Sequence, residues 1–294
     1  GSSRDSVCGA WTRSIFFGGF EYSSAHDEQT FNVQTNTLFV DIRIPTLRQK
    51  KLANLRSFAA LDDIGLRLYA RQHAFGGYTV MDYEGPGNGR PVCTRHHCID
   101  WNFVGVPRPR PNKWWVEFKP STRDSWKEWA YATDDFGQHY YCEQWDRLDG
   151  DSSGSGVVVA LRKAAGAGAC DGILVVVGDH FNFLSGRALL GIENRYNAGS
   201  LVQLIDAAVS VGDRKTAESF LSIEASHGRV SSGWMVDASV QPWREGTKLF
   251  SGAAIEVDVD PNGALSVMWN KEKWDVCESS LSSAPDLKQF LLEG

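Results

Sequence analysis

Long hydrophobic runs and an excess of basic residues are both missing from this chain of 294 residues. No stretch reaches the roughly 18 consecutive apolar residues that mark a membrane-spanning helix, so we predict no membrane span. The formal net charge is −6 at pH 7. An acidic protein repels the phosphates of nucleic acids and anionic lipids, so we predict neither as a partner.

Cysteine is sparse and scattered. The six cysteines stand at positions 8, 93, 98, 142, 170 and 277 and form no C-x-x-C pair. A secreted disulfide scaffold is shorter and denser in cysteine, so we interpret these residues as reduced thiols. The expected location is intracellular, in the cytoplasm, with a trimmed targeting segment as the open alternative.

Familiar cofactor motifs are also missing. The chain has no H-E-x-x-H zinc motif and no G-x-G-x-x-G dinucleotide loop. The first motif places two histidines on one helix face, and the second lets a phosphate approach the backbone. Without them, we predict neither a cofactor nor a resident metal.

Aromatic residues, in contrast, are abundant, with 11 tryptophans and 15 phenylalanines. Most lie in segments where every second residue is hydrophobic, which is the period of a β-strand. In the first half these segments are 11–20, 30–35, 38–44, 78–83, 93–103, 113–118, 126–132 and 139–148. One helical pattern over 47–72, ended by Gly76 and Gly77, interrupts them.

The second half repeats this order after a polar, glycine-rich linker at 149–156. Its expected strands are 157–165, 173–183, 219–230, 233–243, 248–260 and 264–276, with a helix at 201–211 and a short closing helix at 284–294. We therefore predict a mainly β protein of two tandem antiparallel barrels, each with a helical insertion. The predicted domains span 5–150 and 156–294.

Several short segments resemble an uncharacterised bacterial and fungal family. They are W-T-R-S-I-F-F near the start, L-F-V-D-I-R-I-P at 38–45, H-H-C-I-D-W-N at 96–102 and Y-Y-C-E-Q-W at 140–145. The resemblance implies that both barrels are lipocalin-like. Fungal members include a protein associated with a casein kinase, which makes a protein partner an open alternative. The resemblance implies no enzymatic activity.

The segment C-T-R-H-H-C-I-D-W-N-F at 93–103 concentrates the ionisable residues. A metal site needs ligands that converge, but neighbouring residues of a strand point to opposite faces. His96 and His97 therefore diverge, and so do Cys93 and Cys98. A disulfide between these cysteines is excluded because five extended residues span roughly 16 Å, far beyond the Cα separation that a disulfide tolerates.

Alternation along the strands predicts a polar, aromatic face that lines the first barrel. On 93–103 this face holds His96, Asp100 and Asn102, with Ile99, Trp101 and Phe103 opposite. The equivalent residues are Asp41 and Arg43 on 38–44, and Tyr141, Glu143 and Trp145 on 139–148. The apolar faces would pack under the helical insertion or against the other barrel. A half-exposed sheet shows the same alternation, so a solvated surface is the competing interpretation.

The leading functional hypothesis is binding of a small apolar or aromatic ligand in the N-terminal barrel. Trp11, Trp101 and Trp145 would form the walls, and Arg43 would anchor an anionic group. Asp41 and Asn102 would complete the binding face. The first alternative is a cofactor-independent isomerase, cyclase or hydrolase that uses His96, Asp100, Tyr141 and Glu143 for acid–base catalysis. The second alternative is a protein-interaction scaffold.

Overall fold

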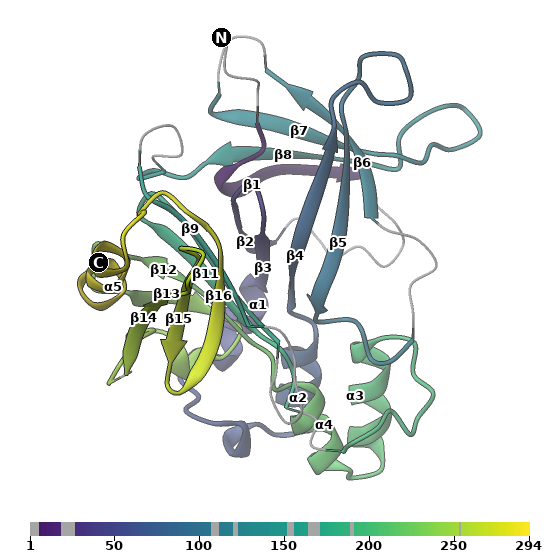
Figure 1. Ribbon diagram of the computed structural model, residues 1–294. Coiled ribbons are helices and arrows are strands. Elements are labelled where there is room, and N and C mark those ends of the chain that lie inside the picture. The colour runs from purple at the N-terminus through teal and green to yellow at the C-terminus, as the bar shows by residue number, and fades with distance from the viewer. Residues whose placement is uncertain are drawn as a thin grey trace.

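The first half of the chain is a closed antiparallel barrel (Figure 1). The computed structural model describes residues 6–18, 27–106, 112–119, 123–151, 156–163, 171–188, 191–252 and 254–294. The barrel strands are β1 (Gly9–Gly18), β2 (Glu28–Gln34), β3 (Phe39–Pro45), β4 (His73–Asp82), β5 (Val92–Asp100), β6 (Asn112–Phe118), β7 (Ser125–Ala130) and β8 (Tyr141–Arg147). The barrel closes because β1 pairs with both β2 and β8. The prediction of a barrel in this half is confirmed.

The helical insertion between β3 and β4 is broken into three pieces. They are α1 (Thr46–Leu52), the 3₁₀ helix η1 (Phe58–Ala60) and α2 (Asp63–Ala70). The single helix predicted over 47–72 is therefore wrong. A new helix begins at α2 because the Asp62 side chain accepts a hydrogen bond from the Gly65 N–H at 2.7 Å, which caps the first turn.

The glycines that were predicted to end the helix lie inside β4 instead. A Cβ atom added to Gly77 would lie 1.9 Å from the carbonyl oxygen of His96. Glycine is therefore required here by the close approach of β5, and it does not serve as a helix cap.

The second half forms an eight-stranded sheet with the order β13-β12-β11-β10-β9-β16-β15-β14. Its strands are β9 (Val158–Lys163), β10 (Gly172–Val177), β11 (His180–Ser185), β12 (Glu224–Arg229), β13 (Met235–Ser239), β14 (Ile255–Val259), β15 (Leu265–Trp269) and β16 (Glu272–Ser279). Its helices are α3 (Leu201–Ser210), α4 (Arg214–Phe220), the 3₁₀ helix η2 (Pro242–Arg244) and α5 (Ala284–Glu293). The helices predicted at 201–211 and 284–294 are confirmed.

Several expected strands of this half have other structures. Residues 173–183 form the hairpin β10–β11, which turns at Gly178 with a positive φ of 59°. The strand predicted at 248–260 starts only at Ile255. Residues 264–276 form the hairpin β15–β16, because Asn270 and Lys271 adopt positive φ angles of 51° and 69° and reverse the chain. The strand predicted at 219–230 starts only at Glu224, after α4 has ended. Residues 19–20, 152–155, 164–165 and 253 of the expected strands and linker lie outside the described residues.

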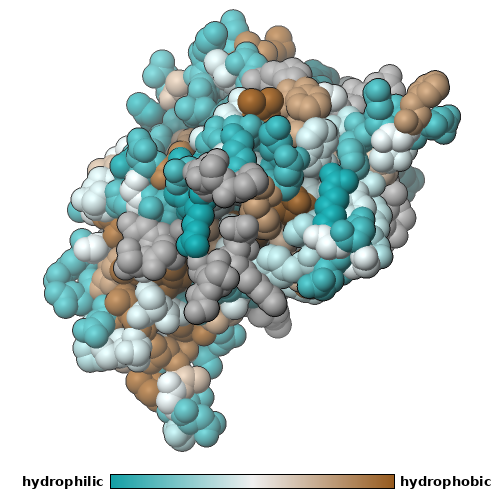
Figure 2. Space-filling model, turned by 90° about the horizontal axis from the view of Figure 1, so that it is seen from above, coloured by the Kyte–Doolittle hydropathy of each residue, from teal (hydrophilic) through white to brown (hydrophobic). Residues whose placement is uncertain are grey.

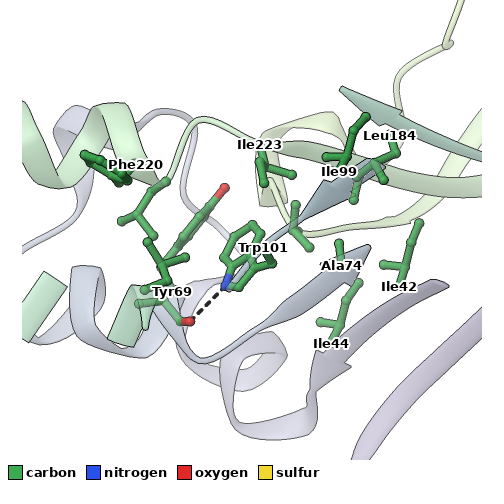
Figure 3. Packing of buried hydrophobic residues seen from close by; sticks show 14 of the residues in the cluster. Ile42, Ile44, Tyr69, Ala74, Ile99, Trp101, Leu184, Phe220 and Ile223 are labelled. Carbon is green, nitrogen blue, oxygen red and sulfur yellow. Dashed lines mark hydrogen bonds between the residues drawn. The ribbon is translucent and has the colours of Figure 1, made fainter. Parts of the chain in front are cut away.

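The largest core lies where the barrel, the second sheet and the helices meet (Figure 3). Val40, Ile42 and Ile44 point out of the barrel and belong to this core, as predicted for the apolar face of β3. Strand β10 is buried along its whole length because the barrel covers one of its faces and β14–β16 with α5 cover the other. This double burial explains the uninterrupted apolar run I-L-V-V-V at 173–177.

The second sheet encloses a separate apolar core. Phe181, Trp234 and Trp274 are buried there, together with Leu287 and Leu291 of α5. In Figure 1, α5 lies beside β14 at the edge of this sheet. Among the described residues, this core joins hydrophobic side chains of the strands to those of α5.

The surface mixes polar and apolar residues. Seen from above, brown hydrophobic residues are interspersed among teal hydrophilic ones (Figure 2). On the barrel wall, the exposed aromatic side chains include Phe17, Tyr78 and Tyr131. Within the described ranges, no helix is long and apolar enough to cross a membrane.

Candidate site in the N-terminal barrel

A cluster of tryptophans fills part of the barrel interior. Trp126 packs edge-on against Trp11 with ring centroids 6.0 Å apart, and it stacks on Trp145 at 5.9 Å. Trp114, Cys93 and Val116 complete this cluster. The predicted inward positions of Trp11 and Trp145 agree with the structure. Inside the barrel, one pair of these indole rings is therefore perpendicular and the other is stacked.

The barrel interior also contains ion pairs. Arg13 on β1 lies 2.6 Å from a carboxylate oxygen of Glu28 and 2.9 Å from one of Glu143. All three side chains are nearly inaccessible to solvent. A buried carboxylate is stable in its charged form only when a cation compensates it. Arg13 supplies this cation for Glu28 on β2 and for Glu143 on β8.

A second charged group surrounds Asp41, as the alternation on β3 predicted. The Nε atom of Arg43 lies 2.9 Å from one oxygen of Asp41, and Asn32 donates to the other at 3.0 Å. Arg95 lies 3.7 Å away. Burial by itself raises the pKa of Asp41, but the guanidiniums of Arg43 and Arg95 outweigh burial and lower it. Asp41 is therefore charged at neutral pH.

Glu128 has an unusually high pKa for a carboxyl group. It stands directly opposite Glu143 on the neighbouring strand. Tyr141 donates to one of its oxygens at 3.0 Å, and the Trp145 indole donates to the other at 3.2 Å. Burial, and then the charge of Glu143, raises the pKa of Glu128 to about 8. Glu128 is therefore mostly protonated at pH 7.

One end of β5 places a histidine beside a carboxylate. The pairing register with β4 shifts between Gly76 and Gly77, which leaves Cys98 as an extra residue in β5. Because of this bulge, His97 and Asp100 share the inner face, with Nδ1 of His97 2.7 Å from an oxygen of Asp100. His97 also stacks on Phe75, with ring centroids 4.5 Å apart.

The bulge corrects three predictions for this segment. His96 points outward and stacks on the exposed Tyr78 at 4.6 Å, so it does not share a face with Asp100. Asn102 follows the end of β5, and its amide nitrogen is 3.5 Å from Nδ1 of His73. Trp101 lies outside the barrel, in the large core, where its indole donates to the Ala70 carbonyl at 3.0 Å (Figure 3). It is no wall of the barrel interior.

Four interior residues escaped the sequence analysis: Arg13, Arg95, His97 and Glu128. The alternation of side chains along the strands could have identified two of them as interior residues. Arg13 is two residues from Trp11, and Glu128 is two residues from Trp126, so each shares a face with an inward tryptophan. The interior positions of Asp41, Arg43, Tyr141 and Glu143 agree with the predicted faces.

Many polar atoms on the inner face of the barrel are buried and have no hydrogen-bond partner. They are Oγ1 of Thr30, Oδ1 of Asn32, Oγ1 of Thr79, Nε of Arg95, Nε2 of His97, Nε1 of Trp114 and Trp126, and Oε2 of Glu143. More than nine in ten buried polar groups of folded proteins are paired. Among the described residues, no group of three or more His, Cys, Asp or Glu is placed to hold a metal ion.

The fold is similar to one found in yeast. The crystal structure of the uncharacterized protein YLR301w from Saccharomyces cerevisiae matches with a TM-score of 0.52 and 14% sequence identity, covering 93% of this chain and 99% of that chain. At this identity the similarity shows the fold alone. No family model and no curated protein matches the sequence. The resemblance to the bacterial and fungal family therefore stays a prediction.

Proposed function

We propose that the interior of the N-terminal barrel binds a small, flat molecule that carries both hydrogen-bond donors and acceptors. The observation that carries this proposal is the set of unpartnered polar atoms on the barrel lining. Each buried group without a partner costs about 1–3 kcal/mol, so an occupant that pairs with several of them gains substantially. Indole N–H groups require an acceptor, and Asn32 Oδ1 and Glu143 Oε2 require a donor.

The charge balance of the interior favours an uncharged occupant. The guanidiniums of Arg13, Arg43 and Arg95 are compensated by nearby carboxylates, and Glu128 is mostly protonated at pH 7. An anionic ligand would compete with Asp41 for Arg43, whose Nε is already bound. In this proposal Arg43 positions Asp41, and the predicted role of anion anchor is secondary. The stacked rings of Trp126 and Trp145 would supply the aromatic contact surface.

We interpret both halves as lipocalin-like, with different uses. The interior of the N-terminal barrel holds charged side chains. In the second half, α5 contributes Leu287 and Leu291 to an apolar core beside β14. This difference supports the N-terminal barrel as the binding half.

Identification of the occupant provides the test. The purified protein would be analysed by native mass spectrometry and by a crystal structure at high resolution. We expect a bound small molecule that contacts Trp126 or Trp114 and pairs with the lining atoms. Ordered water alone in the interior, together with no mass increment, would contradict the proposal, because water satisfies the same atoms.

A pair of matched variants makes the test independent of the ligand's identity. Thr30→Val removes an unpartnered hydroxyl from the lining without changing its shape, and Thr94→Val makes the same change on the outer face of β5. We expect Thr30→Val to lower the retained fraction of ligand several-fold and to leave the ligand-free protein at least as stable as the wild type, because the lost hydroxyl has no protein partner. Thr94→Val should leave both quantities unchanged. Equal retention in both variants would count against binding inside the barrel.

Acid–base catalysis at the same barrel is the second candidate. The observation that favours it is the adjacency of a protonated carboxyl, Glu128, to Tyr141 and to Glu143, which Arg13 binds. His97 and Asp100 replace the predicted pair His96 and Asp100 as the histidine–carboxylate set. A turnover whose rate falls as Glu128 loses its proton near pH 8, and which Glu128→Gln abolishes, would support catalysis. The protein-interaction scaffold stays a prediction.

A further inference from the structure

A cleft lies outside the barrel, where the two halves of the chain meet. It has a volume of about 710 Å³ and is formed by the end of β5, the residues that follow β11, the segment 192–197 and the end of α4. Pockets that bind small ligands occupy about 300–1,000 Å³ and often lie at junctions between structural units. The cleft therefore has the size and the place of a small-molecule site.

Hydrogen bonds between the two halves hold the walls of the cleft. Arg187 donates to the carbonyls of Phe103 and Phe220, both at 2.6 Å. Nδ2 of Asn194 donates to the carbonyl of Val104 at 3.1 Å. These bonds fix the segment that follows β5 against the second half. A ligand would therefore meet walls that are already ordered, which lowers the entropic cost of binding.

Much of the lining is apolar. Ile99, Phe220 and Ile223 line the cleft and are buried members of the large core (Figure 3). Phe103 and Val106 also line it, and each is nearly half exposed. Apolar surface that is gathered around a concavity and accessible to solvent is typical of ligand-binding grooves, whereas single exposed apolar residues are ordinary.

Two carboxylates of the lining already have partners within the protein. Nδ1 of His97 lies 2.7 Å from an oxygen of Asp100, and the guanidinium of Arg162 lies 3.4 Å from an oxygen of Asp171. A third carboxylate, that of Glu193, is exposed, so water solvates its charge. None of the three is thus a buried negative charge that calls for a bound cation.

The guanidinium of Arg187 is engaged as well. Its donors are directed at four main-chain carbonyls, those of Asp100, Trp101, Phe103 and Phe220. An anion that recruited this side chain would break the hydrogen bonds that hold the walls. A charged ligand of either sign would therefore lose hydration on entering the cleft without gaining an unengaged counterion among the described lining residues.

We propose that this cleft binds an uncharged molecule with a hydrophobic body, such as an alkyl or aryl alcohol. The apolar lining takes the body. The side-chain amide of Asn197, which is exposed and lines the cleft, takes the hydroxyl group. The site is separate from the barrel interior, and the proposal does not depend on the function proposed there.

Three probes with one apolar chain test the choice of an uncharged ligand. Octanol, octanoate and octylammonium differ only in their head groups. We expect octanol to bind most tightly in calorimetric titrations at pH 7, and each of the two ions to bind several-fold more weakly. If either ion binds as tightly as octanol, or if octanol does not bind, the proposal is overturned.

Substitutions of exposed lining residues locate the binding without removing core side chains. Phe103→Ser and Val106→Ser should each lower the affinity for octanol several-fold. Phe17→Ser is the matched control, because Phe17 is about as exposed as Phe103 and lies on the outer wall of the barrel, away from the cleft. If neither cleft variant binds octanol more weakly than the control does, octanol binds elsewhere and the proposal fails.

Cys98 provides an internal reporter, because it lines the cleft and is partly exposed. Octanol should slow the alkylation of Cys98, as measured by mass spectrometry of peptides. It should leave the rate at the exposed Cys277 unchanged. Unchanged alkylation of Cys98 at saturating octanol would place the ligand outside the cleft.

Discussion

Glu128 and Glu143 face each other on adjacent strands inside the barrel, and burial, followed by the charge of Glu143, raises the pKa of Glu128 to about 8. Arg13 binds Glu143, whereas Glu128 has only Tyr141 and Trp145 as side-chain partners among the described residues. Two carboxylates at this separation cannot both be charged without a large cost, so the one without a cation keeps its proton. The proton on Glu128 makes the stability of the barrel depend on pH.

Replacement of Glu128 by glutamine should remove this dependence. The pKa of Glu128 is about 8 in the folded protein, above its value near 4.5 in the unfolded chain. Its contribution to stability is thus complete below about pH 4.5 and is lost as the pH rises through 8. Between pH 6 and 9 the wild type should lose about 2–3 kcal/mol that Glu128→Gln keeps.

Urea denaturation at pH 6 and pH 9 measures this difference. Glu84→Gln, which changes an exposed glutamate, is the control and should parallel the wild type at both pH values. If the free energies of unfolding of Glu128→Gln and wild type change equally between the two pH values, Glu128 is ionised throughout and the assignment of its proton is wrong.

Loss of Arg13 should destabilise the protein strongly, because two buried carboxylates lose their shared cation. Removal of one partner from a buried ion pair typically costs about 3–5 kcal/mol. We expect Arg13→Gln to lower the free energy of unfolding by that order. The double variant Arg13→Gln with Glu143→Gln should recover part of the loss, because it removes one of the stranded charges. Thermal denaturation of the single and double variants would show no recovery if Arg13 acted only through packing.

The sequence predicts the inner faces of β3 and β8 correctly because these strands keep regular alternation. Asp41 and Arg43 on one strand, and Tyr141, Glu143 and Trp145 on the other, lie inside as expected. Each of these strands also has an unambiguous apolar or outer face. The separation of polar and apolar side chains onto the two faces of each strand therefore determines which face points into the barrel.

Strand β5 shows where such prediction fails. Alternation holds up to His97, but the extra residue Cys98 reverses it for Asp100. A bulge depends on the partner strand, here on the two glycines of β4, and not on the residues of β5 alone. The burial of Trp101 has a similar cause. Its place depends on α2 and the second sheet, which are distant in sequence.

Acidic pH should weaken the junction between the barrel and the second sheet through His227. This residue stacks on Phe31 of the barrel with ring centroids 4.0 Å apart, and its Nδ1 lies 2.8 Å from Oδ1 of Asn182. Asn182 in turn donates to the carbonyls of Phe31 and Val40. Burial, and then the neighbouring His180, holds the pKa of His227 well below its usual value. The folded protein therefore excludes a proton that the unfolded chain binds.

The sign of the pH effect follows from this lowered pKa. The contribution of His227 to stability is complete above the unfolded value of about 6.5 and falls as the pH drops, by about 2 kcal/mol at pH 5. We expect His227→Gln to show a smaller fall in the free energy of unfolding between pH 7.5 and pH 5 than the wild type. Denaturant titrations at the two pH values measure it. An equal fall in both proteins would mean that His227 takes up a proton without cost.

A methyl group at Gly77 should test the bulge directly. The added Cβ of Gly77→Ala would lie 1.9 Å from the His96 carbonyl oxygen and 2.9 Å from the Cys98 backbone nitrogen. Because both contacts are with backbone, β4 and β5 must separate, and we expect a loss at or beyond the upper end of the roughly 1–3 kcal/mol typical of overpacking. Gly199→Ala is the control, since its methyl group meets only the Gln203 side chain at 3.4 Å. Equal melting temperatures for the two variants would show that β4 and β5 do not approach each other at Cys98, and would place Asp100 on the outer face with His96.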